Sequence, residues 1–212
     1  MTEPLHPEET ITSFLLIRHG HTKATEQGKL YTDPDAPLTS RGHEQAKALA
    51  DWLCKQPAEL LLSSPSNRVR STADIIAAAA DQQPLIVDGL NEWQVGDWEG
   101  KSYWEIKAAE PELYQRWSDD PIHHAPPGGE SILDLGRRVE RQLKEMIAAH
   151  LGRRLALVTH AGVVRGILLY ALGIPVENFW RISVPTGSVS KVDFSENFAT
   201  VHFVAFRPGL TP

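Results

Sequence analysis

Two pairs of adjacent polar residues follow short apolar runs at distant points of the chain. Arg18 and His19 end the stretch "LLIRHGHT", and Thr159 and His160 end the stretch "LVTH". An arginine stays charged and offers a planar fork of N–H donors that fits phosphate oxygens. A neighbouring cation disfavours protonation of His19, so its imidazole stays available as a nucleophile. These residue types predict phosphoryl transfer, which depends chiefly on positioning and charge stabilisation.

Two further residues can join this chemistry. Arg68 lies in "SSPSNR", just inside an expected helix, and Glu92 lies in "DGLNEW", after an expected strand. Glycines at 20 and 162 would let backbone N–H groups approach a ligand, and a helix that starts after Gly162 favours an anion. Each signal alone is ordinary, so the prediction rests on their order at successive strand ends.

The elements that must position these residues follow from the apolar patterning. Short apolar runs predict strands at 13–18, 58–64, 84–87 and 154–160. Helical spacing predicts one helix that is capped by Ser40 and others that span 66–80, 131–150 and 163–173. The alternation indicates a three-layer α/β sandwich, with a mostly parallel central sheet and helices on both faces. Ligands of such sheets bind at the carboxyl ends of the strands. Two last runs, 187–194 and 199–206, predict an antiparallel hairpin.

Residues 91–130 interrupt this pattern. Tryptophans at 93, 98, 104 and 117 and several prolines break the periodicity, and one helix is expected near 102–117. The chain is therefore expected to be a single domain, 1–212, with a lid-like insertion at about 91–130. The tryptophans can form the small core of the insertion, or some of them can line a pocket for an aromatic leaving group.

Composition narrows the classes of partner. The chain has 212 residues and a formal net charge of −6, with no cluster of lysine and arginine, so neither nucleic acid nor an anionic membrane is an expected partner. The beginning of the sequence, "MTEPLHPEET", does not resemble a signal peptide, and no apolar run approaches a membrane span. The one cysteine, Cys54, is expected to be a packed thiol. These features favour a cytoplasmic protein.

The motifs together resemble the histidine phosphatase superfamily, the phosphoglycerate-mutase-like proteins. The resemblance covers nearly the whole chain, in "LLIRHGHT", "PLTSRGHEQA", "LLSSPSNRVRSTA", "LNEWQVGDWEGKS", "PPGGES" and "LVTHAGVVRGIL". It implies that His19 is a nucleophile that forms a phosphohistidine. It also implies that Arg18, Arg68 and His160 hold the phosphoryl oxygens and that Glu92 is the proton donor.

This sequence departs from the family pattern at two positions. Thr25 replaces an asparagine that helps to hold phosphate, so that contact is weakened or is taken over by Thr22 or by Thr25 itself. Ala161 replaces the first glycine of "THGG", and its methyl group is tolerated if φ is negative there. Ala161 can still contribute its backbone N–H to phosphate binding. Neither a metal nor another cofactor is implied, because no metal-binding motif occurs.

Three functions are compatible with these residues. A phosphatase transfers the phosphoryl group from His19 to water, a phosphoglycerate mutase transfers it to a second substrate, and a non-catalytic member only binds a phosphorylated ligand or partner. Hydrolysis is favoured because nucleophile and acid occur together and because only "RPGLTP" follows the last expected strand, too short for the shielding tail of the mutases. The expected partner is a small phosphomonoester. The oligomeric state is not determined, and a homodimer is one candidate.

The substrate depends on the residues around the phosphate site. Trp93, His123 and His124 are candidates for specificity, together with Thr25. The stretches "LNEWQVGDWEG", "WSDDPIHHAPPGGES" and "ENFWRISVPTGSVS" are similar to those of the α-ribazole phosphatases, which act on a benzimidazole nucleoside phosphate in cobalamin synthesis. Broad-specificity phosphatases share much of this pattern, so both substrate classes stay open.

Overall fold

A mixed six-stranded sheet forms the centre of the computed structural model, which describes residues 10–27, 29–30 and 35–209. The strands lie in the order β3-β2-β4-β1-β5-β6. Their bounds are β1 Thr12–Arg18, β2 Leu60–Ser63, β3 Leu85–Ile86, β4 Arg154–Thr159, β5 Val189–Phe194 and β6 Ala199–Phe206. Strands β1 to β4 pair in parallel, whereas β5 pairs antiparallel with β1 and with β6. The expected α/β class and the hairpin are therefore confirmed. The segment 1–9, examined above for a leader, lies outside the described residues.

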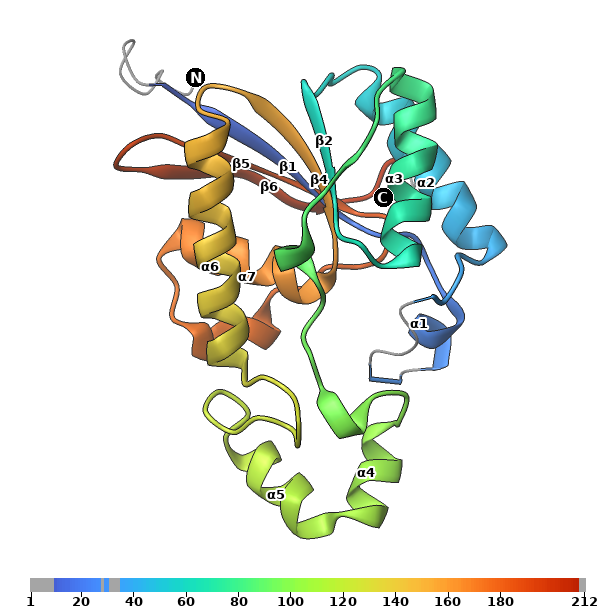
Figure 1. Cartoon of the computed structure of the whole chain (residues 1–212), viewed down its shortest axis with the longest axis vertical. Coiled ribbons are helices and arrows are strands. Elements are labelled where there is room, and N and C mark those ends of the chain that lie inside the picture. The colour runs from blue at the N-terminus through green and yellow to red at the C-terminus, as the bar shows by residue number, and fades with distance from the viewer. Residues whose placement is uncertain (1–9, 28, 31–34, 210–212) are drawn as a thin grey trace.

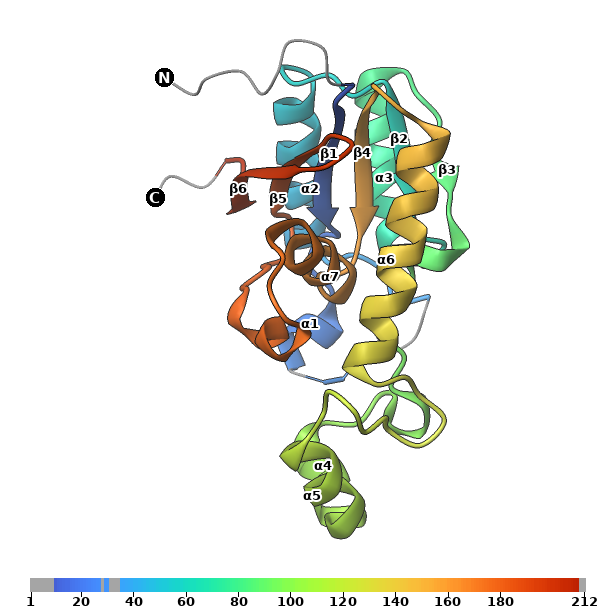
Figure 2. The same cartoon turned by 90° about the vertical axis from the view of Figure 1, so that its left-hand side faces the viewer.

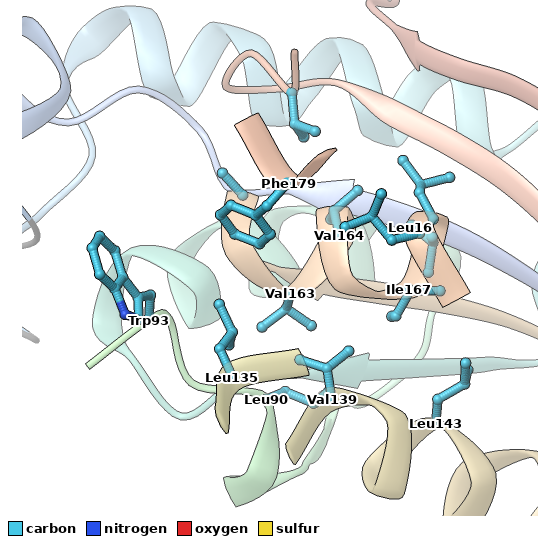
Figure 3. Close-up of a cluster of buried hydrophobic side chains, with 14 of the residues drawn as sticks. Leu16, Leu90, Trp93, Leu135, Val139, Leu143, Val163, Val164, Ile167 and Phe179 are labelled. Carbon is cyan, nitrogen blue, oxygen red and sulfur yellow. The ribbon is translucent and has the colours of Figure 1, made fainter. Parts of the chain in front are cut away.

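Helices cover both faces of the sheet, because the apolar residues of β1 point alternately to the two faces and belong to two cores. Phe14 and Leu16 pack on one side and Leu15 and Ile17 on the other, as the two-residue period of a strand requires. Helices α6 (Ile132–Ala149) and α7 (Ala161–Leu172) cover the first side, and α2 (Ser40–Leu53) and α3 (Asn67–Ala80) cover the second (Figures 1 and 2). Figure 3 shows the first core between α6 and α7, with Trp93 at its edge.

The register of the parallel strands brings the two conspicuous histidines together. Arg18 of β1 pairs with Thr159 of β4, so His19 and His160 leave the sheet side by side. The backbone N–H of His19 still donates to the Thr159 carbonyl, at 3.0 Å. Strand β2 ends next to them, because the Ser64 N–H donates to the Val158 carbonyl at 3.1 Å. The carboxyl ends of three strands thus meet at one edge.

The segment 91–130 leaves the sheet and forms two helices where one was expected. These are α4 (Tyr103–Ala109) and α5 (Pro111–Asp119), and both lie beyond the end of the sheet (Figures 1 and 2). The single helix predicted near 102–117 was wrong because Pro111 has no N–H to continue α4 and disfavours a helical residue before it. Glu110 accordingly has φ −137° and ψ 62°. A short 3-10 turn, η2 (Gly96–Trp98), precedes α4.

Most tryptophans of this segment are core residues. Trp98 is fully buried and its ring meets that of Trp117 edge-on, with centroids 5.3 Å apart. Trp93 stacks on Trp117 at 6.0 Å and belongs to the same core. Trp104, by contrast, is 80% exposed. The expectation of a small aromatic core therefore fits Trp98 and Trp117. Trp93 fits both expectations, because it belongs to this core and also lines a cavity.

Three local expectations need correction. Helix α2 is capped by Thr39, whose hydroxyl accepts from the Gly42 N–H at 3.2 Å, so Ser40 is its first residue rather than its cap. Cys54 is exposed, because it caps the end of α2 instead of packing within it. Helix α7 starts at Ala161, two residues earlier than expected.

The remaining elements are short. They are α1 (Lys23–Gln27), η1 (Asp88–Leu90) and η3 (Val176–Arg181). Among the described residues, no helix combines the length and the apolar character that crossing a membrane requires.

Candidate active site

A cavity of about 130 Å³ lies at the carboxyl ends of β1, β2 and β4. Six residues singled out in the sequence line it: Arg18, His19, Thr22, Thr25, Arg68 and Glu92. Lys29 lines it as well and was not anticipated. The predicted crevice is therefore present for these residues, and it is rich in cationic side chains. His160, expected to hold phosphoryl oxygens there, is fully buried behind Arg68 and does not line this cavity.

His19 is a neutral imidazole whose Nε2 carries the lone pair. Nδ1 lies 2.8 Å from the Gly20 carbonyl, which can only accept, so Nδ1 holds the proton. Nε2 accepts a hydrogen bond from Nε of Arg68 at 3.3 Å. The pKa of His19 is well below its usual value, first because the ring is buried and then because Arg68 and Arg18 are close. Burial is therefore a larger cause than the neighbouring cation that the sequence indicated.

His160 is also neutral, with the opposite tautomer. Its Nδ1 lies 3.0 Å from Nη2 of Arg68, which can only donate, so Nδ1 must accept and Nε2 carries the proton. Nε2 lies 3.0 Å from the Ser64 hydroxyl. Burial, and then Arg68 and His19, hold the pKa of His160 well below its usual value. Arg68 thus bridges both imidazoles, whose ring centroids are 5.4 Å apart.

Arg18 is anchored by a backbone carbonyl. Its Nη1 donates to the Val184 carbonyl at 2.6 Å, in the loop before β5. Its Nε is buried and has no hydrogen-bond partner among the described residues. A buried donor without a partner carries a desolvation cost that an anionic oxygen in the cavity would remove.

Glu92 presents one carboxylate oxygen to the backbone and leaves the other available. Oε1 accepts from the N–H of Trp93 at 3.0 Å and from the N–H of Gly162 at 2.9 Å. Oε2 makes no hydrogen bond within the described part of the chain. A carboxylate fixed through one oxygen can carry a proton on the other and face a reacting group with it.

Arg138 of α6 fixes the loop that carries Glu92. Its guanidinium donates to the carbonyls of Gly89 and Asn91, both at 2.9 Å, and of Glu92, at 3.2 Å. It also makes a two-point contact with the carboxylate of Glu130, at 2.5 Å and 3.1 Å. Glu130 stands at the far end of the insertion, so Arg138 ties both ends of that segment to α6.

The two departures from the family pattern fit the site. The hydroxyls of Thr22 and Thr25 lie 3.1 Å apart, and both residues line the cavity, so a threonine pair stands near the position of the missing asparagine. Ala161 is the first residue of α7 and has a negative φ, so its methyl group causes no strain.

The glycines at 20 and 162 serve the protein rather than a ligand. The Gly20 N–H donates to the Thr72 hydroxyl at 3.1 Å, and a side chain there would collide with the Gly42 carbonyl. The Gly162 N–H is used by Glu92. The expectation that these two N–H groups face a ligand was therefore wrong, because internal acceptors occupy them.

Comparison with known proteins supplies the family. The sequence model of the histidine phosphatase superfamily (branch 1) matches residues 14–206. The chain belongs to this superfamily. It is 31% identical to the adenosylcobalamin/α-ribazole phosphatase of Escherichia coli (strain K12), over 91% of this chain and 95% of that one. It is also 31% identical to a glucosyl-3-phosphoglycerate phosphatase of Mycolicibacterium vanbaalenii, over 87% of this chain and 84% of that one.

A solved structure agrees over the whole fold. The crystal structure of the α-ribazole phosphatase from Shigella flexneri superposes with a TM-score of 0.85 at 30% identity and covers 94% of this chain and 100% of that one. The resemblance read from the sequence motifs is thus confirmed, both for the histidine phosphatase family and for its fold.

Two of the candidate specificity residues lie away from the cavities around Glu92. His123 and His124 are exposed in the turn after α5, where the His123 ring lies 3.0 Å from the Asp120 carboxylate. Neither residue lines the cavities that Arg68, Glu92 or Trp93 line. Trp93, in contrast, lines two cavities beside Glu92. Of the specificity candidates, the histidine phosphatase fold therefore brings Trp93 and Thr25 to the site.

The sequence motifs did not single out one basic residue of the site. Arg165 lies on α7, one helical turn after Ala161, and lines a cavity with Arg18 and Glu92. Ala161 lines this same cavity and not the one around His19. Since residues four apart share a helix face, the expected role of Ala161 could have suggested Arg165. No group of three or more histidine, cysteine or acidic residues that could hold a metal ion occurs within 10–27, 29–30 and 35–209.

Proposed function

We propose that this protein is a phosphomonoester hydrolase that works through a phosphohistidine at His19. The observation that carries the proposal is the lone pair on His19 Nε2, held in the neutral ring within a cavity that Arg18, Arg68 and Glu92 also line. In the first step Nε2 attacks phosphorus, and the bond from phosphorus to the ester oxygen breaks as the P–N bond forms. Oε2 of Glu92 gives its proton to the departing oxygen.

The second step returns the enzyme to its starting state. Glu92, now a carboxylate, takes a proton from a water molecule, and the hydroxide attacks phosphorus and breaks the P–N bond. The products are inorganic phosphate and neutral His19. Arg18 and Arg68 stabilise the charge on the phosphoryl oxygens in both steps, as donors fixed before the reaction.

His160 acts in this proposal through Arg68 and as a neutral group. Its Nδ1 accepts from Nη2 of Arg68, which fixes the guanidinium between the two imidazoles. A protonated His160 could not accept that hydrogen bond. The charge that stabilises the phosphoryl group therefore comes from the two arginines.

Hydrolysis is favoured over the two alternatives. The compared relatives are named as phosphatases, and two of them act by name on α-ribazole phosphate or on glucosyl-3-phosphoglycerate. A protein that only binds a phosphorylated ligand needs neither a nucleophile nor an acid. For the substrate we propose α-ribazole 5′-phosphate, supported by these names and by the aromatic rings of Trp93 and Trp180 beside Glu92.

Trapping the intermediate tests the proposal. Brief reaction with ³²P-labelled p-nitrophenyl phosphate, followed by quenching at alkaline pH, should give a labelled protein whose label is lost in acid, as phosphohistidine requires. His19→Ala should give no label, whereas His43→Ala, which changes an exposed histidine on α2, should be labelled normally. An acid-stable label, or normal turnover by His19→Ala, would overturn the proposal.

Two other expectations stay predictions. A homodimer is testable by light scattering of the purified protein, which should give about twice the chain mass of 23.5 kDa. A cytoplasmic location is testable by fractionation of the source cells.

A further inference from the structure

A chain of hydrogen bonds runs from His160 to residues that the proposed mechanism does not use. Nε2 of His160 lies 3.0 Å from the Ser64 hydroxyl, and that hydroxyl lies 3.4 Å from Oδ1 of Asn91. Nδ2 of Asn91 donates to the Asp88 carbonyl at 2.9 Å. Ser64 directly follows β2, and Asn91 directly precedes Glu92, so the chain joins two segments that converge on the site.

The Asp88 carbonyl sets the direction of the hydrogen bonds along this chain. A carbonyl can only accept, so the amide nitrogen of Asn91 faces it and Oδ1 faces Ser64. Oδ1 can also only accept, so the Ser64 hydroxyl donates to it and keeps a lone pair for His160. Nε2 of His160 must therefore carry a proton. Arg68 requires the same tautomer from the other side of the ring, because its Nη2 donates to Nδ1.

Arg68 depends on both imidazoles as acceptors. Its Nε donates to His19 at 3.3 Å, and its Nη2 donates to His160 at 3.0 Å. The ring of His19 donates from Nδ1 directly to the Gly20 carbonyl. The ring of His160 has no such direct carbonyl contact, and the Ser64 hydroxyl is the closer of two hydroxyls around its Nε2. Ser64 thus fixes the imidazole that fixes the guanidinium.

Burial makes the Ser64 hydroxyl difficult to replace. Ser64 and His160 are both fully buried. The second hydroxyl near Nε2 of His160 is that of Ser66, at 3.4 Å, and Ser66 is only partly buried and lines a cavity of about 360 Å³. Water in that cavity can bind to Ser66. Loss of the Ser64 hydroxyl, in contrast, leaves a buried N–H group with a poor acceptor, which is costly.

We propose that Ser64 is a positioning residue, whose hydroxyl acts through His160 to hold Arg68 in place for His19 and for the phosphoryl group. This role rests on the proposed phosphatase function, because Arg68 must keep its position when Nε2 of His19 attacks phosphorus. Asn91 extends the chain into the loop that carries Glu92. The segment of the acid and the guanidinium that stabilises the phosphoryl group are therefore oriented together.

Ser64→Ala tests this role, and the neighbouring residue offers a matched control. Ser63 is also fully buried, and its hydroxyl donates to the Ser64 carbonyl at 2.9 Å, outside the chain. We expect Ser64→Ala to lower kcat/KM by about 5- to 50-fold for p-nitrophenyl phosphate and for glycerol 1-phosphate alike, because both substrates present the same phosphoryl group. Ser63→Ala should change either value less than about threefold.

NMR of the imidazole groups reports the tautomers without any turnover. In protein labelled with ¹⁵N-histidine, we expect His160 to carry its proton on Nε2 and His19 on Nδ1, with His160→Gln and His19→Gln to assign the signals. The Nε2 proton of His160 should exchange slowly with water, because Ser64 binds it in a buried position. Ser64→Ala should speed this exchange by about tenfold or more, and Ser63→Ala should leave it unchanged. A general packing defect would affect both variants alike.

Asn91→Ala provides a second variant at the partly buried end of the chain. It removes the acceptor of the Ser64 hydroxyl. The values of kcat/KM for the two substrates should therefore fall together, by about 2- to 10-fold. Glu92→Gln differs in this respect, because loss of the acid should fall mainly on glycerol 1-phosphate, whose leaving oxygen needs a proton.

Three results would overturn the role of Ser64. They are unchanged kcat/KM in Ser64→Ala or equal losses in Ser63→Ala, a loss in Ser64→Ala and Asn91→Ala that is confined to glycerol 1-phosphate, and a His160 ring that carries its proton on Nδ1. Failure of the proposed function looks different. If p-nitrophenyl phosphate does not phosphorylate His19 in the unchanged protein, the phosphatase proposal fails, whereas the NMR signals still report the hydrogen-bond chain.

Discussion

The backbone N–H of Gly162 donates to Oε1 of Glu92 at 2.9 Å, and this contact exists because residue 162 has no side chain. A Cβ atom built on Gly162 would collide with that same oxygen. The first turn of α7 thus binds a carboxylate from a loop that lies 70 residues away in sequence.

Gly162→Ala should therefore displace the proposed acid. We expect kcat for an alkyl phosphate such as glycerol 1-phosphate to fall by about 10- to 100-fold, part of the ~10²–10⁴-fold that general acid catalysis contributes. Gly136→Ala is the matched control in α6, where a Cβ would meet only Val176 at an ordinary 3.7 Å. That enzyme should keep its activity and gain about 0.5–1 kcal/mol of stability. Equal activity of the two variants would contradict the role given to this contact.

Replacing the acid itself should expose its role through the leaving group. Glu92→Gln keeps the shape of the side chain, and its Oε1 can still accept the hydrogen bonds from Trp93 and Gly162. Steady-state turnover of glycerol 1-phosphate should fall steeply, by about 10²–10⁴-fold. Phosphorylation of His19 by p-nitrophenyl phosphate, followed by rapid quench, should suffer much less, because nitrophenolate leaves without a proton. Equal losses in that first step for both substrates would show that Glu92 is not the acid.

The partly buried pair between Arg138 and Glu130 should matter for stability and for the acid together. Arg138→Lys cannot make the two-point contact or reach three carbonyls, so it leaves partly buried acceptors unpaired. Urea unfolding should show a loss of about 2–4 kcal/mol. The activity ratio of glycerol 1-phosphate to p-nitrophenyl phosphate should fall as well, which a purely structural defect would not cause. Arg137→Lys, next to it and exposed, should change neither quantity.

The two neutral histidines should make the protein less stable in mild acid. Burial, followed by the charge of Arg68, lowers the pKa of both His19 and His160 well below 6.5. Below pH 6.5 these two histidines bind protons in the unfolded chain but stay neutral in the folded chain, so the free energy of unfolding falls as the pH falls. Each histidine contributes a slope of about 1.4 kcal/mol per pH unit until its folded pKa is reached.

Urea unfolding between pH 7.5 and 5 measures this slope. In a His160→Gln variant the free energy of unfolding should fall less steeply with falling pH. The difference should be about 1.4 kcal/mol per pH unit, the slope of one histidine. The same depressed pKa of His19 keeps its Nε2 unprotonated, so kcat/KM should show no loss from His19 at pH 6.5. A parallel fall in both proteins, or an acid limb of kcat/KM centred at pH 6.5, would contradict these assignments.

Chelation should leave the reaction unchanged. Arg18 and Arg68 supply the positive charge that a divalent cation supplies in many phosphatases. Turnover of p-nitrophenyl phosphate in 5 mM EDTA should match that in buffer alone. Loss of activity in EDTA that Mg²⁺ or Zn²⁺ restores would reject this expectation.

Local pattern was enough to predict the parts of the site. The apolar run before Arg18, the one before His160 and the turn residues around Glu92 each depend on neighbours in sequence. The order of strands and helices then placed these residues at one edge of a parallel sheet, because carboxyl ends of parallel strands meet there.

Only the tertiary structure decided how those parts act on one another. The register of Arg18 against Thr159, the opposite tautomers of His19 and His160, and the Glu92–Gly162 contact join segments that no periodicity relates. Pro111 separates α4 from α5, and only the folded chain brings Tyr103 and Trp117, from the two sides of that break, into a stacked pair. Which N–H groups of Arg165 find an acceptor also depends on the segments that pack around it, such as the Ile182 carbonyl that binds its Nε. Hydrogen bonding and burial between distant segments are properties of the packed chain, so they appear only when the chain is folded.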